Sequence, residues 1–206
     1  MACYLIRDKE GNPKVGFIHI YKNGGMSVRK EIDRICKDRG YTQEVVAQDE
    51  GSLFLNKQAF EHWGDDWGHA YKFAIVRLPY SRMVSLYHFI IQRKQKPLFD
   101  MIKGKSFKQF MQMTFEHKTG ANVKQKDYVL VDNVMRVQHI CHLETLEQDL
   151  KVVNAQTGLD FKIKHDNKSQ HKHWSQYFPK SVLNATFKFF KEDFELFGYT
   201  KQGNLS

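Results

Sequence analysis

The amino-acid sequence predicts an α/β fold with a central, mainly parallel sheet flanked by helices. Three observations lead to this prediction. Apolar runs of strand length alternate with segments whose apolar residues recur at helical spacing. Polar loops follow two of these runs directly, as at the carboxyl ends of parallel strands, where ligands bind. The 206 residues, 41% of them hydrophobic, can form one compact core, so we expect a single domain over residues 1–206.

The individual elements are placed by spacing and by turn signals. We predict strands at residues 15–20, 44–48, 71–76 and 137–141, after a short apolar run at 3–6 and a turn at 10–13. We predict helices from residue 28, at 57–63, from about 80, at 106–118, from about 143, and from 183 to 197. Gly198 suits the C-cap of the last helix. The stretch 119–135 has no clear pattern, and 164–176 forms a basic loop.

Charge and cysteine usage narrow the class of protein. The net charge of +9 favours polyanionic partners such as nucleic acid, acidic membranes, phosphate-rich cofactors or acidic sugars. The three widely spaced cysteines predict neither a disulfide framework nor a zinc site, which favours a reducing, cytoplasmic compartment. No stretch approaches the roughly 20 apolar residues of a membrane span, and the first residues lack an apolar signal segment, so neither anchoring nor secretion is expected.

The loop at residues 21–27 combines the features of a phosphate cradle. Gly24 and Gly25 let main-chain N–H groups approach an anion closely, and the following helix presents the positive end of its dipole there. Lys22 and Ser27 add a cation and a hydroxyl group. Because Lys22 precedes the glycines, the loop lacks the G-x-x-x-x-G-K-[ST] order of a Walker A motif, the signature of a Mg-nucleotide triphosphate site.

The segment HIYKNGGMS, residues 19–27, resembles the H-I-P-K-T-G-G-T-S loop of the carbohydrate and heparan-sulfate type of PAPS-dependent sulfotransferases. The resemblance implies a three-layer P-loop-NTPase-like fold. It also implies that the 5′ end of 3′-phosphoadenosine 5′-phosphosulfate (PAPS) is bound by Lys22, Asn23, Gly24, Gly25, Met26 and Ser27. Tyr21, Asn23 and Met26 depart from the family pattern. Two threonine hydroxyls are thereby lost, although Asn23 can still donate a hydrogen bond and Met26 still offers its main chain.

The segment FAIVRLPYSRMVSLY, residues 73–87, resembles the family's F-V-R-[DN]-P-x-x-R-L-V-S-x-Y segment. The resemblance implies that Arg77 and Ser85 bind the 3′-phosphate of PAPS, and a guanidinium group suits that role because it can contact two phosphate oxygens at once. Arg82 is a further phosphate candidate, or it ties the loop to an acidic neighbour. Leu78 stands where the family has Asp or Asn.

Further segments extend the resemblance over residues 15–199. Residues 144–150 (ETLEQDL) resemble E-N-L-x-x-D-[FL], and residues 177–179 and 191–199 resemble the family's closing segment, whose aromatic residues fill the core. The basic loop resembles one that closes over the nucleotide in the family, which implies contacts from Lys168 and Ser169. An ordinary solvated loop is the other interpretation.

Sulfuryl transfer needs an in-line arrangement of donor and acceptor and a stabilised leaving group. We expect Lys22 to stabilise the bridging oxygen as the bisphosphate product (PAP) departs. A general base should deprotonate the acceptor, a hydroxyl or amine and most readily that of a carbohydrate. Glu50 is our first choice of base, because it follows the strand at 44–48 closely; the other candidates are Asp49, His62 and His69.

No metal is expected, because neither His171 and His173 nor the cluster at residues 139–142 completes a ligand set. Three other functions stay open. A small kinase would bind Mg-ATP, but no Walker A motif is present. A basic nucleic-acid-binding module fits the charge, but no RRM, KH or zinc-finger signature occurs. A degenerate sulfotransferase that binds nucleotide without turnover fits the lost threonines.

Overall fold

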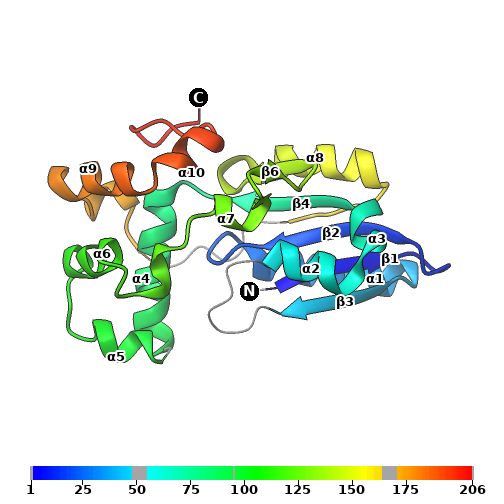
Figure 1. Ribbon diagram of the computed structural model, residues 1–206, viewed down its shortest axis with the longest axis horizontal. Helices are drawn as coiled ribbons and strands as arrows, with labels where there is room; N and C mark the ends of the chain where they lie inside the picture. The colour runs from blue at the N-terminus through cyan, green and yellow to red at the C-terminus, as the bar shows by residue number, and fades with distance from the viewer. Residues whose placement is uncertain (1, 48–54, 95, 164–170, 206) are drawn as a thin grey trace. The chain divides into compact units, whose positions relative to one another are not determined.

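The computed structural model describes residues 2–47, 55–94, 96–163 and 171–205 (Figure 1). The chain divides into two compact units. Residues 1–76 with 125–167 contain the main sheet and form the sheet unit, and residues 77–124 with 168–206 form the helical unit. The single domain expected over the whole chain stays a prediction.

Five strands form the main sheet, in the order β3-β1-β2-β4-β7. They are β1 (Ala2–Arg7), β2 (Pro13–His19), β3 (Thr42–Ala47), β4 (Tyr71–Val76) and β7 (His139–His142). β4 runs parallel to β2 and to β7, whereas β1 is antiparallel to both of its neighbours. Four of these five strands therefore share one direction, which confirms the predicted mainly parallel sheet.

The antiparallel strand β1 arises from the apolar run at residues 3–6 and the turn that follows it. Asp8 fixes this turn, because its Oδ1 accepts hydrogen bonds from the N–H groups of Glu10 at 3.1 Å and Asn12 at 2.8 Å. Gly11 adopts φ 85°, a conformation that glycine reaches without strain. The turn folds β1 back onto β2 as a hairpin, so the sheet begins with an antiparallel pair.

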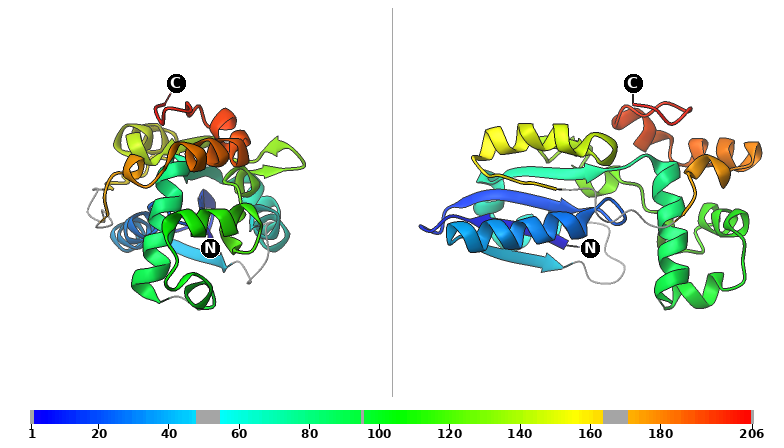
Figure 2. Two further views of the ribbon diagram at one scale, coloured as in Figure 1. Left: turned by 90° about the vertical axis from the view of Figure 1, so that its left-hand side faces the viewer. Right: turned by 180° about the vertical axis from the view of Figure 1, so that it is seen from behind.

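Helices cover both faces of the sheet, as alternation along the strands requires. On one face, Phe17, Phe73 and Ile75 share a buried core with α1 (Gly25–Arg39) and α8 (Leu146–Thr157). On the other face, Gly16 and Lys72 lie against Trp67 of α3 (Asp65–His69), which follows α2 (Leu55–Trp63). Figures 1 and 2 show α2 and α3 in front of the sheet and α1 behind it. The three predicted layers are thus present in the sheet unit.

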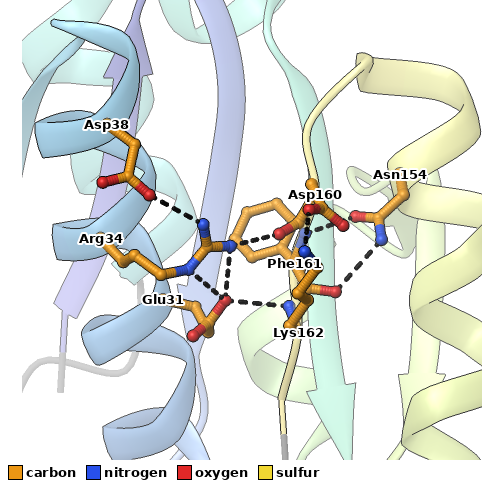
Figure 3. Close-up of polar contacts among 7 residues, drawn as sticks. All are labelled: Glu31, Arg34, Asp38, Asn154, Asp160, Phe161 and Lys162. Atoms are coloured by element: carbon orange, nitrogen blue, oxygen red, sulfur yellow. Dashed lines mark hydrogen bonds and ion pairs between the residues drawn. The ribbon is translucent and has the colours of Figure 1, made fainter.

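Helix α1 is tied to the chain segment that follows α8 (Figure 3). Arg34 donates to Glu31 on its own helix at 2.8 Å and to the main-chain oxygen of Asp160 at 2.5 Å. Asn154 of α8 holds the same segment from its other side, because its amide bonds to both the N–H and the carbonyl of Phe161. These contacts fix the direction of α1, whose first turn follows the predicted phosphate loop.

The previously unassigned stretch 119–135 contains short elements. They are the 3-10 helix η1 (Gly120–Asn122), α7 (Lys126–Val129), β5 (Leu130–Val131) and β6 (Val134–Met135), of which β5 and β6 pair as a small hairpin. A further 3-10 helix, η2 (Leu143–Thr145), leads from β7 into α8. Elements this short carry too few periods for their spacing to be recognised.

The helical unit is built around an aromatic core. Its helices are α4 (Pro79–Arg93), α5 (Leu98–Ile102), α6 (Phe107–Phe115), η3 (Trp174–Gln176), α9 (Lys180–Phe189) and α10 (Lys191–Leu196). Tyr80 lies at its centre, with ring centroids 4.8 Å from Trp174, 5.2 Å from Phe178 and 5.0 Å from Phe194. Within the described ranges, no helix combines the length and apolarity needed to cross a membrane.

The single helix predicted at residues 183–197 is wrong, because the chain bends at Phe190. Phe190 has φ −99° and ψ 21° and stands between α9 and α10. The bend leaves its ring fully buried and brings the ring of Phe187 to 5.0 Å from that of Phe194. Burial of the Phe190 and Phe194 rings outweighs the helical hydrogen bonds lost at the bend.

Candidate active site

The loop that follows β2 has an unusual main-chain conformation. Lys22 adopts φ 71° and Gly24 adopts φ 80°, both in the left-handed region. Glycine reaches this region freely, but a lysine there is held by its surroundings, and such residues concentrate at functional sites. The predicted phosphate loop is therefore a tightly turned segment, in which the main chain rather than a side chain caps helix α1.

The loop leaves three consecutive N–H groups available. Among the described residues, no acceptor takes a hydrogen bond from the main-chain N–H of Gly24, Gly25 or Met26. The N–H groups of Asn23 and Ser27, which we also expected to hold an anion, already bond to loop carbonyls at 3.3 and 3.0 Å. The first turn of the 15-residue helix α1 has no acidic residue. These donors and the helix dipole together favour an anion at this point.

Neighbouring side chains leave no room for a side chain at Gly24 or Gly25. A methyl group added at Gly25 would lie 1.9 Å from Cδ2 of His19, the last residue of β2, and one added at Gly24 would lie 2.9 Å from Leu143. Contacts that short force the neighbouring side chain to move. His19 was part of the recognised motif, but its role as the surface against which Gly25 packs was not apparent from the sequence.

Lys22 supplies the positive charge of this loop. Its Nζ lies 5.7 Å from the centroid of the Tyr21 ring. The pKa of His19 is lowered to about 4, chiefly because the imidazole is buried. The positive charges of the N-terminus, Lys22 and Arg29 lower it further. His19 is thus neutral at pH 7 and does not add a second cation beside Lys22.

The Asn23 side chain points into the protein instead of toward a ligand. Asn23 is 1% exposed, and its Nδ2 donates to the carbonyl of Ile75 at 2.8 Å and to Oε1 of Gln125 at 2.7 Å. Both of its amide hydrogens are therefore used within the sheet unit. The side-chain hydrogen bond that we expected Asn23 to give a ligand is replaced by these internal contacts.

In the helical unit, Arg77 is the first residue after β4 and precedes the start of α4. Leu78 is the N-cap of that helix and Pro79 its first residue, with no acidic residue in the first turn. Ser85 lies further along the same helix and is 4% exposed. Arg82 donates to the carbonyl of Val123 at 2.9 Å and is 3% exposed.

The comparisons with known proteins identify the family. A family model described as "Sulfotransferase family" matches residues 8–200. The chain belongs to the sulfotransferase family. Neither the search of curated proteins nor the search of solved structures found a match. Family membership supports sulfuryl transfer as the class of activity and agrees with the P-loop-like architecture seen in the sheet unit.

The third resembling segment, residues 144–150, has a structural role in which Asp149 is central. Its Oδ2 accepts hydrogen bonds from the N–H of His142 at 2.6 Å and from the hydroxyl of Thr145 at 3.0 Å. These bonds fix the passage from β7 into α8. They also place Leu143 against Gly24 of the phosphate loop.

Two of the predicted general bases, His62 and His69, are not brought to this loop. Asp49, Glu50, Lys168 and Ser169 lie outside the described residues. His62 is exposed in the last turn of α2, next to Trp63, whose Nε1 donates to Glu44 near the start of β3. His69 ends α3, just before β4 begins. Both histidines are therefore positioned toward the amino ends of the parallel strands, away from the loop after β2.

A groove of about 710 Å³ opens at the amino end of β4. Its lining includes Phe60, Trp67, Met135 and Arg136, together with the side of Lys72. None of the sulfotransferase motif residues lines it. Nor do the described side chains offer three His, Cys, Asp or Glu residues grouped to hold a metal ion.

Proposed function

We propose that this protein transfers a sulfuryl group from PAPS to a hydroxyl or amine of an acceptor, with a carbohydrate as the expected acceptor. The observation that carries the proposal is the loop at Lys22–Met26. It presents three consecutive main-chain donors beside a lysine in the left-handed conformation, at the start of a helix with no acid in its first turn. Membership of the sulfotransferase family supports sulfuryl transfer as the chemistry of this loop.

The residues present suit the donor. PAPS would supply the activated sulfuryl group. The N–H groups of Gly24, Gly25 and Met26 would bind the oxygens at its 5′ end, and Lys22 would neutralise the charge that develops on the bridging oxygen. Ser27 would add a hydroxyl, and Arg77 and Ser85 would bind the 3′-phosphate.

Glu50 remains our first choice for the general base, ahead of Asp49 and His62. The argument is topological: β3 ends at Ala47 and shares its direction with β2, so the chain leaves β3 at the same edge of the sheet as the phosphate loop. Asp49 and Glu50 follow within three residues of the end of β3 in the sequence. His62 starts from the opposite half of the sheet, because α2 ends beside Glu44.

The other parts of the proposal concern partners and place. Lys168 and Ser169 would contact the nucleotide, and no metal takes part. A cytoplasmic location is compatible with the three buried cysteines, which form no disulfide. A protein that binds PAP without turnover is the second candidate, and it is favoured by the exposed side chain of Met26 and the inward side chain of Asn23, which stand where the family has threonines.

Isothermal titration of PAP tests the nucleotide site. We expect wild-type protein to bind PAP without added metal, and Arg77→Ala to lose at least about tenfold in affinity, because a charge-assisted contact to phosphate is removed. Arg93→Ala is the matched control, because Arg93 is an exposed arginine in the last turn of α4, the helix that follows Arg77. Mg-ATP serves as the control ligand.

Each other outcome has a definite meaning. Absence of PAP binding by the wild type would refute the PAPS proposal and bring nucleic-acid binding forward, to be tested by its steep salt dependence. Tight Mg-ATP binding would favour a kinase. PAP binding without release of PAP from PAPS, across hydroxyl and amine acceptors, would identify the binding-only protein.

A further inference from the structure

The phosphate loop is held from behind by a buried pair of side-chain amides. Asn23 and Gln125 are 1% and 0% exposed, and their amides meet at 2.7 Å between Nδ2 and Oε1. The second hydrogen of the same Nδ2 goes to the carbonyl of Ile75, two residues before Arg77. One side chain therefore joins the loop to the end of β4 and to the residue that precedes α7 (Figure 1).

The position of this amide pair indicates that it stabilises the conformation of the loop. Asn23 lies between Lys22 and Gly24, the two residues of this loop with positive φ. Its Oδ1 is buried without a hydrogen-bond partner among the described residues, which is costly for an amide oxygen. The side chain thus satisfies its two donors at the expense of its acceptor. A left-handed lysine persists only where its surroundings fix it, and Asn23 is its immediate neighbour.

We propose that Gln125 is a positioning residue of the sulfuryl-transfer site, acting through Asn23 on Lys22. Gln125 holds the Asn23 amide, the amide holds the loop in its left-handed turn, and the turn directs Lys22 and the N–H groups of Gly24 and Gly25 toward the anion. The role in transfer rests on the function proposed above. The tie itself is a property of the folded loop and can be measured without any nucleotide.

The first experiment measures hydrogen–deuterium exchange without nucleotide at the amides of Asn23 and Ser27, the two N–H groups of this loop that bond to loop carbonyls. Gln125→Met keeps the side-chain length but removes the strong acceptor, and we expect exchange in this loop to accelerate at least about tenfold. Gln125→Glu keeps an accepting oxygen and should retain most of the protection. Thr114→Val is the control, because it removes a buried hydroxyl pair with Thr119 in the helical unit and should leave exchange of the loop unchanged.

The second experiment asks whether Gln125 acts through Lys22. We expect Gln125→Met to lower kcat by about 10- to 100-fold, because small displacements of a catalytic group have large effects. In a Lys22→Ala background, the same substitution should lower kcat no further. Thr114→Val should lower the melting temperature while leaving kcat of the folded protein unchanged.

The outcomes separate the two proposals. If exchange in the loop is unchanged in Gln125→Met, or if the kcat losses of Lys22→Ala and Gln125→Met multiply, Gln125 is not a positioning residue. If the wild type neither binds PAP nor uses PAPS, the proposed function fails, and the exchange measurement alone then decides whether the amide pair holds the loop.

Discussion

The two ends of the parallel strands contain similar residues, a lysine and a glycine, in different surroundings. At the amino end of β4, the ammonium group of Lys72 donates to three carbonyls, those of Trp67 at 2.8 Å, Gly68 at 3.0 Å and Ala70 at 2.8 Å. At the carboxyl end of β2, Lys22 lies in a loop whose next three residues include two glycines, and where N–H groups lack acceptors among the described residues.

The difference shows that the presence of a lysine and a glycine does not by itself indicate an anion-binding site. Gly16, like Gly25, has a ring where its side chain would be, that of Trp67. Lys72 is 6% exposed, and its three partners match the three donors of an ammonium group. A ligand finds no unused group on that side chain. What distinguishes the loop after β2 is its three main-chain donors, for which the described residues offer no acceptor, together with the left-handed backbone at Lys22.

The largest expected effect comes from placing a methyl group at each glycine. Gly25→Ala should weaken PAP binding by about 100-fold or more, because the methyl group would displace His19 and with it the start of α1. Gly16→Ala should instead cost about 1–3 kcal/mol of unfolding free energy, through its contact with Trp67, and keep the PAP affinity of the folded protein. Calorimetric titration and urea unfolding of both variants measure these effects.

The double variant His19→Ala with Gly25→Ala checks the cause. Removal of the imidazole makes room for the methyl group, so a substantial part of the PAP affinity lost in Gly25→Ala should return. Failure to recover any affinity would mean that Gly25 is needed for another reason, such as direct approach of the nucleotide to its main chain.

Much of the sheet unit could be predicted from the sequence, because its elements are long enough to show a period. The strand at residues 71–76 is confirmed at both ends, and the loop after residue 20 connects a strand to a helix as expected. The antiparallel course of β1 could not be predicted, since an apolar run of four residues does not reveal which neighbour it will pair with. The bend at Phe190 was missed because helical spacing of phenylalanines continues through it.

The candidate site was predictable in its residues but less so in their orientations. The motif drew attention to Asn23, but a sequence cannot show that the amide faces Ile75 and Gln125 instead of a ligand. Gln125 itself stands in the stretch without a clear pattern, where a lone glutamine gives no signal. Its partner is 102 positions away, and only the folded chain brings the two together.

A smaller effect is expected when Lys72 is replaced, because its ammonium group already donates to three carbonyls at the amino end of β4. Lys72→Met leaves three carbonyls without their ammonium partner, so we expect a loss of about 2 kcal/mol of unfolding free energy with no change in PAP affinity. Lys57→Met is the matched control on the same groove, since Lys57 is exposed and its ion pair with Glu61 is 3.8 Å long; it should change stability by less than about 0.5 kcal/mol. A loss of PAP affinity in Lys72→Met would mean that the two ends of the sheet are coupled.

The smallest expected effect is a pH dependence of the free energy of unfolding that arises from His19, the last residue of β2. Its pKa is lowered from 6.5 to about 4 in the folded protein, chiefly by burial. Between these values the unfolded chain binds a proton at His19 that the folded chain does not, so the free energy of unfolding must decrease as the pH falls. From pH 7 to pH 5.5 this contribution amounts to about 1 kcal/mol, and it is absent above pH 7.

Urea unfolding of wild type and His19→Gln at the two pH values isolates this contribution. The wild type should lose about 1 kcal/mol more than the variant between pH 7 and pH 5.5, because glutamine does not titrate. An equal loss in both proteins would show that His19 is protonated as readily in the folded chain as in the unfolded one. The imidazole would then be solvated, and the close packing against Gly25 that excludes a methyl group there would have to be abandoned.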